Sequence, residues 1–588
     1  KIIGDNTDMY AQAYFDYDSK KSGGVTMSHL RFGKKPIKST YLIHKANFVA
    51  CHNPSYVRKY NMVQELVDGG TFLLNCPWDM EGLEKHLPGQ VKAFIANHGI
   101  KFYIIDGVKI GIETGMGPTR INTILQSAFF KLADIIPEDQ AIDLMKAAAK
   151  ATYGRKGDDV VQKNWAAIDA GAKQVVVVQV PESWKNAADE GLEMTHAENG
   201  RKDAVDFVNT IQSKVSAQEG NSLPVSAFKD YVDGSTPSGT SAYEKRGIAV
   251  NVPVWNSENC IQCNRCSYVC PHAAIRPVAL TAEEAEKAPE GMKVMPMTGM
   301  ADYKFAMVVS AYDCTGCGSC ANVCPGKKGA KALAMENMEA SAGEQKYFDY
   351  AVELPAKADV VAKYKENTVK GSQFKQPLLE FSGACAGCGE TPYAKLITQL
   401  FGDRMYIANA TGCSSIWGNS SPSTPYTVNE KGQGPAWSNS LFEDNAEFGY
   451  GMLLAQKAIR DGLKTKVESV MANEKASEDV KAACQEWLDT FGVGATNGAA
   501  TDKLVEVLSG VDCDVCRDIV KNKDFLAKKS QWIFGGDGWA YDIGFGGVDH
   551  VLASGKDINV MVFDTEVYSN TGGQASKATR TGAIAQFA

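Results

Sequence analysis

The sequence predicts a multidomain α/β protein in which a small, cysteine-rich α+β domain separates two larger α/β domains. Residues 1–225 alternate short β-rich runs with longer amphipathic stretches, which is typical of a mostly parallel sheet covered by helices. The same cysteine pattern occurs twice between residues 260 and 324. A third domain begins after residue 365, with apolar strands at 532–534 and 559–563. The length of 588 residues allows about four domains.

The first region offers strands and helices at regular intervals, and a linker follows it. Residues 219–241 are rich in Gly, Ser and Pro and predict an exposed linker. Candidate strands are 40–43, 48–51, 71–75, 102–105 and 175–180, with a candidate helix at 122–132. The predicted domains are 1–225, a linker at 226–250, then 251–350 and 365–588.

The duplicated cysteine pattern has the spacing by which bacterial two-cluster ferredoxins hold two [4Fe–4S] clusters. The runs are Cys260, Cys263, Cys266 and Cys270, then Cys314, Cys317, Cys320 and Cys324, each followed by Pro. The fourth cysteine of each run binds the other cluster. We therefore assign cluster one to Cys260, Cys263, Cys266 and Cys324, and cluster two to Cys314, Cys317, Cys320 and Cys270. Zinc knuckles use paired CxxC motifs, and disulfide scaffolds belong to short secreted chains, so both alternatives are disfavoured.

A third cysteine set consists of Cys385, Cys388 and Cys413. These residues could supply three ligands of another [4Fe–4S] cluster, although the spacing alone also allows a zinc site or a redox dithiol. Candidates for a fourth ligand are Cys484, Cys513 and Cys516, or a cysteine beyond Ala588.

Gly536-Asp537-Gly538 follows one apolar strand, and Asp564-Thr565 ends the next. Glycines after a strand let backbone amides approach a phosphate at a helix N-terminus, and a nearby carboxylate can hold Mg²⁺. We assign Mg²⁺ to the Asp537 carboxylate, the Thr565 hydroxyl and the Val567 carbonyl. The simpler alternative is a tight turn without a ligand.

Composition limits the classes of partner. The formal charge of −8, without basic stripes, argues against nucleic acid. No apolar run approaches the roughly 18 residues of a membrane span. Cysteine clusters of this kind fit the cytoplasm, where thiols stay reduced. The chain starts without Met, and we expect more polypeptide on both sides.

In this order, these motifs closely resemble pyruvate:ferredoxin (flavodoxin) oxidoreductase, in the C-terminal half of its long single-chain form. The resemblance lies in Cys385 to Glu390, Cys413, Gly536 to Gly538, Thr565 to Gln574 and Glu244-Lys245-Arg246. It implies a γ-type domain on the coenzyme A side at 1–225, a ferredoxin-like domain with two [4Fe–4S] clusters at 251–350, and a thiamine diphosphate domain at 365–588. Most thiamine diphosphate enzymes carry two asparagines where this chain has Asp564-Thr565.

The resemblance also implies residue roles. Cys385, Cys388 and Cys413 become ligands of a third [4Fe–4S] cluster whose fourth ligand follows the end of this chain. Asn570 lies near the substrate and is the candidate catalytic residue. The residues implied in cofactor binding are Glu390, Cys413, Gly536, Asp537, Gly538, Thr565, Glu566, Val567, Tyr568, Ser569 and Asn570.

The implied activity is oxidative decarboxylation of pyruvate with coenzyme A to acetyl-CoA and CO₂. Electrons pass from the thiamine adduct through three clusters to ferredoxin or flavodoxin. The family expectation is a cytoplasmic homodimer of anaerobic metabolism. Two alternatives remain: the same chemistry on another 2-oxo acid, and a polyferredoxin electron carrier without catalysis.

Overall fold

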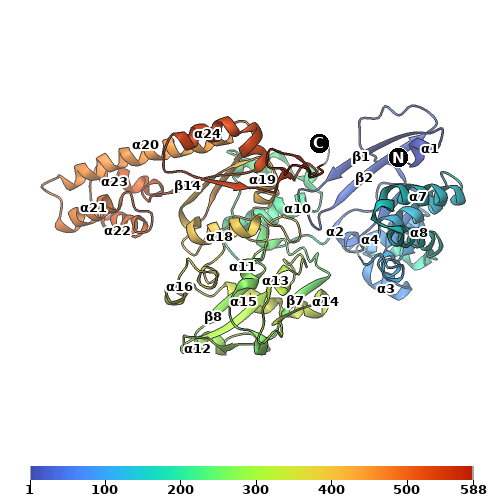
Figure 1. The fold of residues 1–588 in the computed structure, drawn as a ribbon, viewed down its shortest axis with the longest axis horizontal. Helices are drawn as coiled ribbons and strands as arrows, with labels where there is room; N and C mark the ends of the chain where they lie inside the picture. The colour runs from blue at the N-terminus through green and yellow to red at the C-terminus, as the bar shows by residue number, and fades with distance from the viewer. Residues whose placement is uncertain (1, 119, 586–588) are drawn as a thin grey trace. The chain divides into compact units, whose positions relative to one another are not determined.

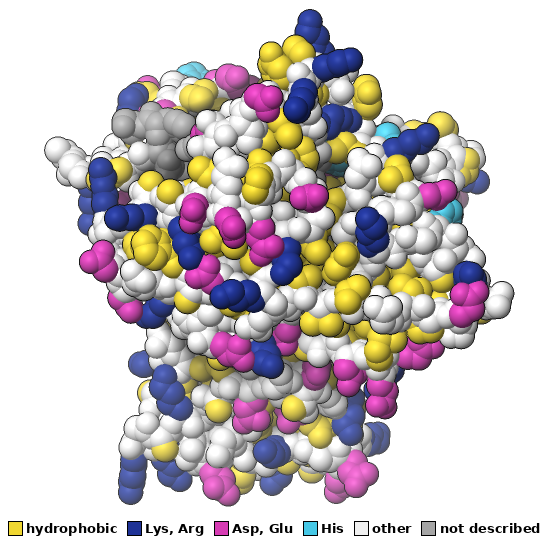
Figure 2. Space-filling view, turned by 90° about the vertical axis from the view of Figure 1, so that its right-hand side faces the viewer, with side chains coloured by type: hydrophobic (Ala, Val, Ile, Leu, Met, Phe, Trp, Pro, Cys, Tyr) yellow, Lys and Arg dark blue, Asp and Glu magenta, His cyan; other side chains and the backbone are white. Residues whose placement is uncertain are grey.

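A computed structural model describes residues 2–118 and 120–585 (Figure 1). The chain divides into two compact units. The first comprises residues 1–17, 25–196 and 210–227, and the second comprises 18–24, 197–209 and 228–588. Within the described residues, none of the helices has the length and apolar character required to cross a membrane. On the face drawn in Figure 2, acidic and basic side chains are interspersed.

The first unit is built on a four-stranded sheet with the strand order β3-β4-β5-β6. The first three strands are parallel, and the short β6 pairs with β5 in the antiparallel direction. The strands are β3 (Ala46–Cys51), β4 (Leu66–Asn75), β5 (Lys101–Ile105) and β6 (Val176–Val177). The helices are α1 (Ile2–Asn6), α2 (Tyr56–Lys59), α3 (Met80–His86), α4 (Gly89–Asn97), α5 (Gly107–Glu113), α6 (Asn122–Ala133), α7 (Glu138–Tyr153), α8 (Asp158–Lys173) and α10 (Ser213–Ser216).

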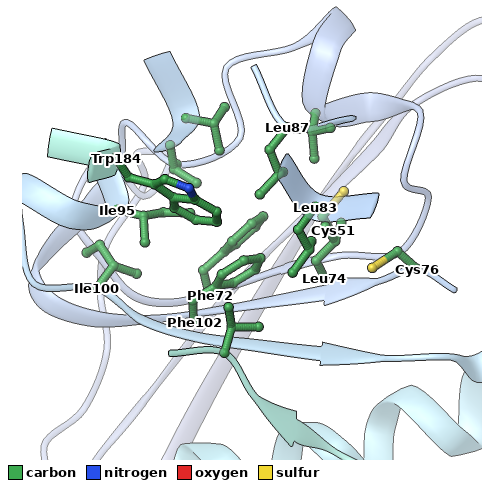
Figure 3. Close-up of a cluster of buried hydrophobic side chains, with 14 of the residues drawn as sticks. Cys51, Phe72, Leu74, Cys76, Leu83, Leu87, Ile95, Ile100, Phe102 and Trp184 are labelled. Carbon is green, nitrogen blue, oxygen red and sulfur yellow. The ribbon is translucent and has the colours of Figure 1, made fainter. Parts of the chain in front are cut away.

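Both faces of this sheet are covered. Successive residues of β4 alternate between two cores, because side chains of a strand point to opposite faces in turn. Phe72 and Leu74 belong to the core formed with α3 and α4, whereas Leu73 packs with α6 and α8. Figure 3 shows the first of these cores, where the Phe72 and Phe102 rings stack 5.4 Å apart beneath Trp184. Each such buried aromatic contributes about 2 kcal/mol of hydrophobic free energy.

Two predictions for this region need correction. Residues 40–43 are not a strand, because the Arg31 guanidinium, rather than a neighbouring strand, donates hydrogen bonds to the Tyr41 and Leu42 carbonyls. The predicted strand at 175–180 shortens to β6. The other predicted strands and the helix at 122–132 are present as β3, β4, β5 and α6. The sequence reading missed the antiparallel hairpin of β1 (Tyr10–Tyr17) and β2 (Thr26–Gly33).

The ferredoxin-like domain in the second unit repeats one pattern of strand, cysteine loop, short helix and strand. The first copy contains β7 (Asn251–Trp255), α11 (Arg265–Tyr268) and β8 (Ile275–Leu280), and the second contains β10 (Lys304–Val309), α13 (Ser319–Val323) and β11 (Leu333–Asn337). The copies exchange strands, because β7 pairs with β11 and β8 pairs with β10. Further elements of the second unit are α9 (Lys202–Phe207), α12 (Ala282–Glu286), β9 (Met295–Pro296), α14 (Met338–Ser341), α15 (Gln345–Val352), α16 (Ala358–Tyr364) and α17 (Val369–Ser372).

The rest of the second unit contains a parallel sheet with the strand order β13-β12-β14-β15. Its strands are β12 (Met405–Ala410), β13 (Ala436–Ser440), β14 (Ser530–Gly536) and β15 (Asn559–Phe563), followed by the small pair β16 (Val567–Tyr568) and β17 (Gln574–Ala575). Its helices are α18 (Thr391–Phe401), α19 (Cys413–Gly418), α20 (Asn445–Met471) and α24 (Phe545–Ala553). This sheet agrees with the predicted α/β class.

A helical insert lies between β13 and β14. It consists of the C-terminal part of α20 with α21 (Glu478–Thr490), α22 (Asn497–Ser509) and α23 (Asp514–Lys521), seen as the orange helices of Figure 1. These helices enclose a hydrophobic core of their own around Trp487 and Leu504. Cys484 and Cys516 are buried in that core, and Cys513 packs against it.

The predicted linker is mostly exposed, as expected, except at its end. Thr240 and Ser241, which close its Gly-Ser-Pro-rich part, are buried rather than exposed. The Thr240 hydroxyl accepts a hydrogen bond from the Thr424 amide at 2.9 Å. The end of this segment is therefore packed against the third domain.

Candidate functional site

Each of two cavities in the ferredoxin-like domain is lined by four cysteines. Cys260, Cys263, Cys266 and Cys324 line one cavity, with Trp255, Met307 and Leu333 in its apolar wall. Cys270, Cys314, Cys317 and Cys320 line the other, with Ile275, Val309 and Met335. In each cavity the fourth cysteine comes from the other run, which is the crossed arrangement of two-cluster ferredoxins.

In both cysteine loops the second and fourth residues after the first cysteine adopt the left-handed backbone conformation. Gln262 and Asn264 have φ of 56° and 58°, and Gly316 and Gly318 have φ of 69° and 76°. The Gln262 amide donates to Cys260 Sγ at 3.4 Å, and the Gly316 amide donates to Cys314 Sγ at 3.3 Å. Amide donors of this kind stabilise thiolates and tune the reduction potential of a bound cluster.

The cysteine cavities fit clusters better than single ions. Burial raises the pKa of the Cys314 thiol to about 12 and also raises the pKa of Cys266 and Cys320, so metal binding must release protons. Across the described residues, no three His, Cys, Asp or Glu side chains are placed to share one metal ion. Four thiols spread around a cavity suit a cluster in which each iron has its own thiolate.

Cys385, Cys388 and Cys413 gather beside the parallel sheet. Cys413 begins α19 directly after β12, and the loop of Cys385 and Cys388 leads into α18. Burial raises the pKa of the Cys413 thiol to about 12, and nearby Glu390, Cys388 and Cys385 add to the rise. The three other candidate ligands lie in the helical insert and are not part of this core: Cys484, Cys513 and Cys516.

The third cysteine set adjoins the ferredoxin-like domain. Gly387, between Cys385 and Cys388, has φ of 76°, and a β-carbon there would lie 3.6 Å from the Cys317 β-carbon. His272, two residues after Cys270, makes a 3.1 Å contact from Nε2 to the Ala384 carbonyl. The loop that carries Cys385 therefore packs directly on residues that line the second cavity.

The predicted Mg²⁺ ligands converge at the carboxyl ends of β14 and β15. Gly536 pairs with Phe563 in the parallel register, so Asp537 and Thr565 emerge at the same edge of the sheet. The buried Asp537 carboxylate lies 3.4 Å from the Thr565 hydroxyl, which also contacts the Val567 carbonyl at 3.0 Å. The Ser576 hydroxyl donates to the other Asp537 oxygen, a contact that the sequence reading missed.

The structure also places other residues that were predicted to bind the cofactor. A β-carbon at Gly538 would lie 2.4 Å from the Tyr568 ring, so this close approach requires glycine. The Asn570 Oδ1 atom is buried and has no hydrogen-bond partner among the described residues. Glu390 accepts a 2.7 Å hydrogen bond from the Trp417 indole, and burial raises the pKa of its carboxyl group. An unpaired acceptor and a buried acid fit a site that takes a polar ligand.

Comparison with known proteins agrees with this geometry. Residues 2–174 match the family described as pyruvate ferredoxin/flavodoxin oxidoreductase, and residues 259–328 match a 4Fe-4S dicluster domain. Residues 194–249 match the EKR domain, whose function is unknown.

Named relatives align along the whole chain. The chain is 54% identical over 595 residues to a pyruvate-flavodoxin oxidoreductase of Enterobacter agglomerans, covering 100% of this chain and 50% of the relative. It is also 54% identical over 598 residues to the pyruvate:ferredoxin oxidoreductase of Moorella thermoacetica, with the same coverage. Along its whole length the chain thus resembles one half of the pyruvate:ferredoxin (flavodoxin) oxidoreductases. A pyruvate dehydrogenase [NADP(+)] of Cryptosporidium parvum is 46% identical over 649 residues, covering 100% of this chain and 33% of the relative.

The chain spans about half the length of the first two relatives. The structure also places Trp417 at this site, a residue that the sequence analysis did not single out. Trp417 holds Glu390 and packs its ring 5.7 Å from that of Phe563, so it links the third cysteine set to the end of β15. No local motif marks Trp417, because its partners are distant in sequence.

Proposed function

We propose that the full-length protein oxidatively decarboxylates pyruvate with coenzyme A to acetyl-CoA and CO₂, and passes two electrons to ferredoxin or flavodoxin. The bond between the carboxyl and keto carbons breaks, a thioester forms and one proton is released. The observation that carries the proposal is the position of the third cysteine set, which shares a core with the ends of β14 and β15 and touches the second cysteine cavity through Gly387.

The proposed iron–sulfur ligands follow the cavities. Cluster one uses Cys260, Cys263, Cys266 and Cys324, cluster two uses Cys270, Cys314, Cys317 and Cys320, and Cys385, Cys388 and Cys413 supply three thiolates of a third cluster. With clusters bound, the contact of Gly387 with Cys317 would bring the third cysteine set next to the second cavity, and the three clusters would supply a path for electrons toward the first cavity. The apolar cavity walls limit the access of water to the sulfurs, except at the exposed Cys317, and solvent access is a factor that sets cluster potentials.

Asp537, Thr565 and Val567 would hold Mg²⁺ and, through it, the diphosphate of thiamine diphosphate. Gly536 and Gly538 leave room for the phosphates beside the backbone amides. Bound thiamine diphosphate supplies the electron sink for decarboxylation. Glu390 faces the same core as Cys413 and can hold a proton in this buried place, and Asn570 offers an unpaired carbonyl oxygen toward the substrate.

Residues 1–225 belong to the coenzyme A side of the proposed enzyme, which we place in the cytoplasm as a homodimer. All sixteen cysteines are free in the structure. This agrees with a compartment in which thiols stay reduced and remain available to iron.

The test is anaerobic assay of the full-length protein with pyruvate, coenzyme A and ferredoxin or flavodoxin. We expect two electrons to reach the acceptor for each acetyl-CoA formed. We also expect the purified protein to contain bound thiamine diphosphate. A panel of 2-oxo acids identifies the substrate, and preference for another member would change the substrate but keep the chemistry. Reducible clusters without bound thiamine diphosphate or 2-oxo acid oxidation would identify an electron carrier instead.

A further inference from the structure

The Glu244-Lys245-Arg246 segment, which lies in the region matched by the EKR domain of unknown function, packs against a hairpin tip far away in the sequence. The tip, residues 18–24, joins β1 to β2 and belongs to the second unit. Lys20 Nζ lies 3.0 Å from Glu244 Oε1, and the two side chains are only 7% and 9% exposed. A buried ion pair of this kind persists only with good geometry and further hydrogen bonds, which Ser423 and Ser420 provide to Lys20.

The same tip holds the loop of the third cysteine set, residues 383–388. The Lys21 amide donates to the Gly383 carbonyl at 2.8 Å, and the Ala386 amide donates to the Ser22 hydroxyl at 2.9 Å. Ala386 lies directly between Cys385 and Gly387. The Arg246 guanidinium donates to the Ser22 carbonyl and thereby fixes the residue that caps the loop.

Lys245 contacts the residues next to the second cysteine run instead of the hairpin tip. Its ammonium group pairs with the buried carboxylate of Asp313, the residue before Cys314, and the Gly247 amide donates to the Tyr312 carbonyl at 2.8 Å. Lys245 has φ of 41°, a conformation that a non-glycine residue keeps only where its surroundings demand it. Glu244 and Arg246 thus bind the hairpin tip while Lys245 binds the second cysteine run.

We propose that residues 244–246 and 18–24 form a clamp that positions the Cys385 loop against the Cys314 run and so stabilises the third cluster. The inference rests on the proposed function, because it needs that cluster. These are positioning residues, which act through the loop and its backbone. Ser22 satisfies a loop amide, and Glu244, Arg246 and Lys245 keep Ser22 and the Cys314 run in fixed relation.

The test compares Ser22→Ala with Ser19→Ala in the full-length protein. Both changes remove one hydroxyl from the same tip, but the Ser19 hydroxyl contacts only Asp18 within the tip. We expect Ser22→Ala to release third-cluster iron to a chelator about tenfold faster than wild type, as loss of a residue that supports metal ligands does. Ser22→Thr keeps the hydroxyl and should restore slow release. The Cys385→Ala variant identifies the third-cluster EPR signal by difference.

The outcomes separate the two proposals. If wild type and Cys385→Ala contained equal amounts of iron, the proposed third cluster would be refuted, and with it the proposed electron path. Three clusters in wild type, with the same release rate and EPR signal in Ser22→Ala and Ser19→Ala, would overturn the clamp alone. As a second variant, Lys20→Met should weaken the third cluster while leaving the other two, whereas Lys457→Met, which breaks an exposed pair with Asp461, should leave all three.

Discussion

Replacing Thr565 by Val tests the proposed Mg²⁺–diphosphate site with little change of shape. The two side chains have similar size, but Val lacks the hydroxyl that lies 3.4 Å from Asp537 and 3.0 Å from the Val567 carbonyl. That hydroxyl is the third oxygen of the converging set. Thr565→Ser keeps the hydroxyl and is the matched control.

The magnitude follows from the loss of one oxygen near a charged group. Such an interaction contributes about 2 kcal/mol, which corresponds to about 30-fold weaker binding. Thr565 is exposed, and exposed substitutions change the free energy of unfolding by only about 0.5 kcal/mol. We therefore expect a large change in cofactor affinity and almost none in the stability of the cofactor-free protein.

Calorimetric titration of the full-length protein with thiamine diphosphate and Mg²⁺ measures the affinity, and thermal unfolding without cofactor measures stability. Thr565→Val should bind about 30-fold more weakly, and Thr565→Ser within a few-fold of wild type. Wild-type affinity in Thr565→Val would refute the assignment of its hydroxyl to the metal. Equal weakening in Thr565→Ser would point to packing instead.

Three further predictions concern other parts of the chain. Cys324→Ala should remove the same cluster as Cys260→Ala, and loss of the cluster that Cys314→Ala removes, seen in EPR spectra, would contradict the crossed assignment. Gly538→Ala should abolish cofactor binding, because its β-carbon would lie 2.4 Å from the Tyr568 ring, whereas Gly546→Ala, with open space around it, should bind normally in the same titration. Trp487→Ala should cost about 3–5 kcal/mol in the helical insert, visible as faster hydrogen exchange of α20–α23 with unchanged iron content; unchanged exchange would show that this core is not needed.

Local patterns predicted the parts of the site that depend on neighbours in sequence. Each cysteine loop places three thiols within seven residues, so spacing alone determined which cysteines could share a cavity. The Gly536 to Gly538 turn and the strand before it were equally local. The crossing of Cys270 and Cys324 could be predicted only because the two-cluster pattern is already known to cross.

The wrong predictions concern segments whose structure depends on contacts outside the segment. Residues 40–43 have strand-like composition, but the Arg31 side chain satisfies their carbonyls, so they join no sheet. The Gly-Ser-Pro-rich linker seemed exposed by composition, yet its end is buried because Thr240 meets the Thr424 amide. In both places a partner outside the segment itself, rather than its own composition, decided the structure.

Sequence patterns were enough to predict the α/β class, the two runs of four cysteines, and the strand ends that carry Asp537 and Thr565. The folded chain was needed to show that Gly387 meets Cys317, that Trp417 holds Glu390, and that Lys20 and Ser22 reach Glu244 and the Cys385 loop. Such contacts join residues between 27 and 364 positions apart. Their energy comes from burial and hydrogen bonding that exist only once the chain has folded.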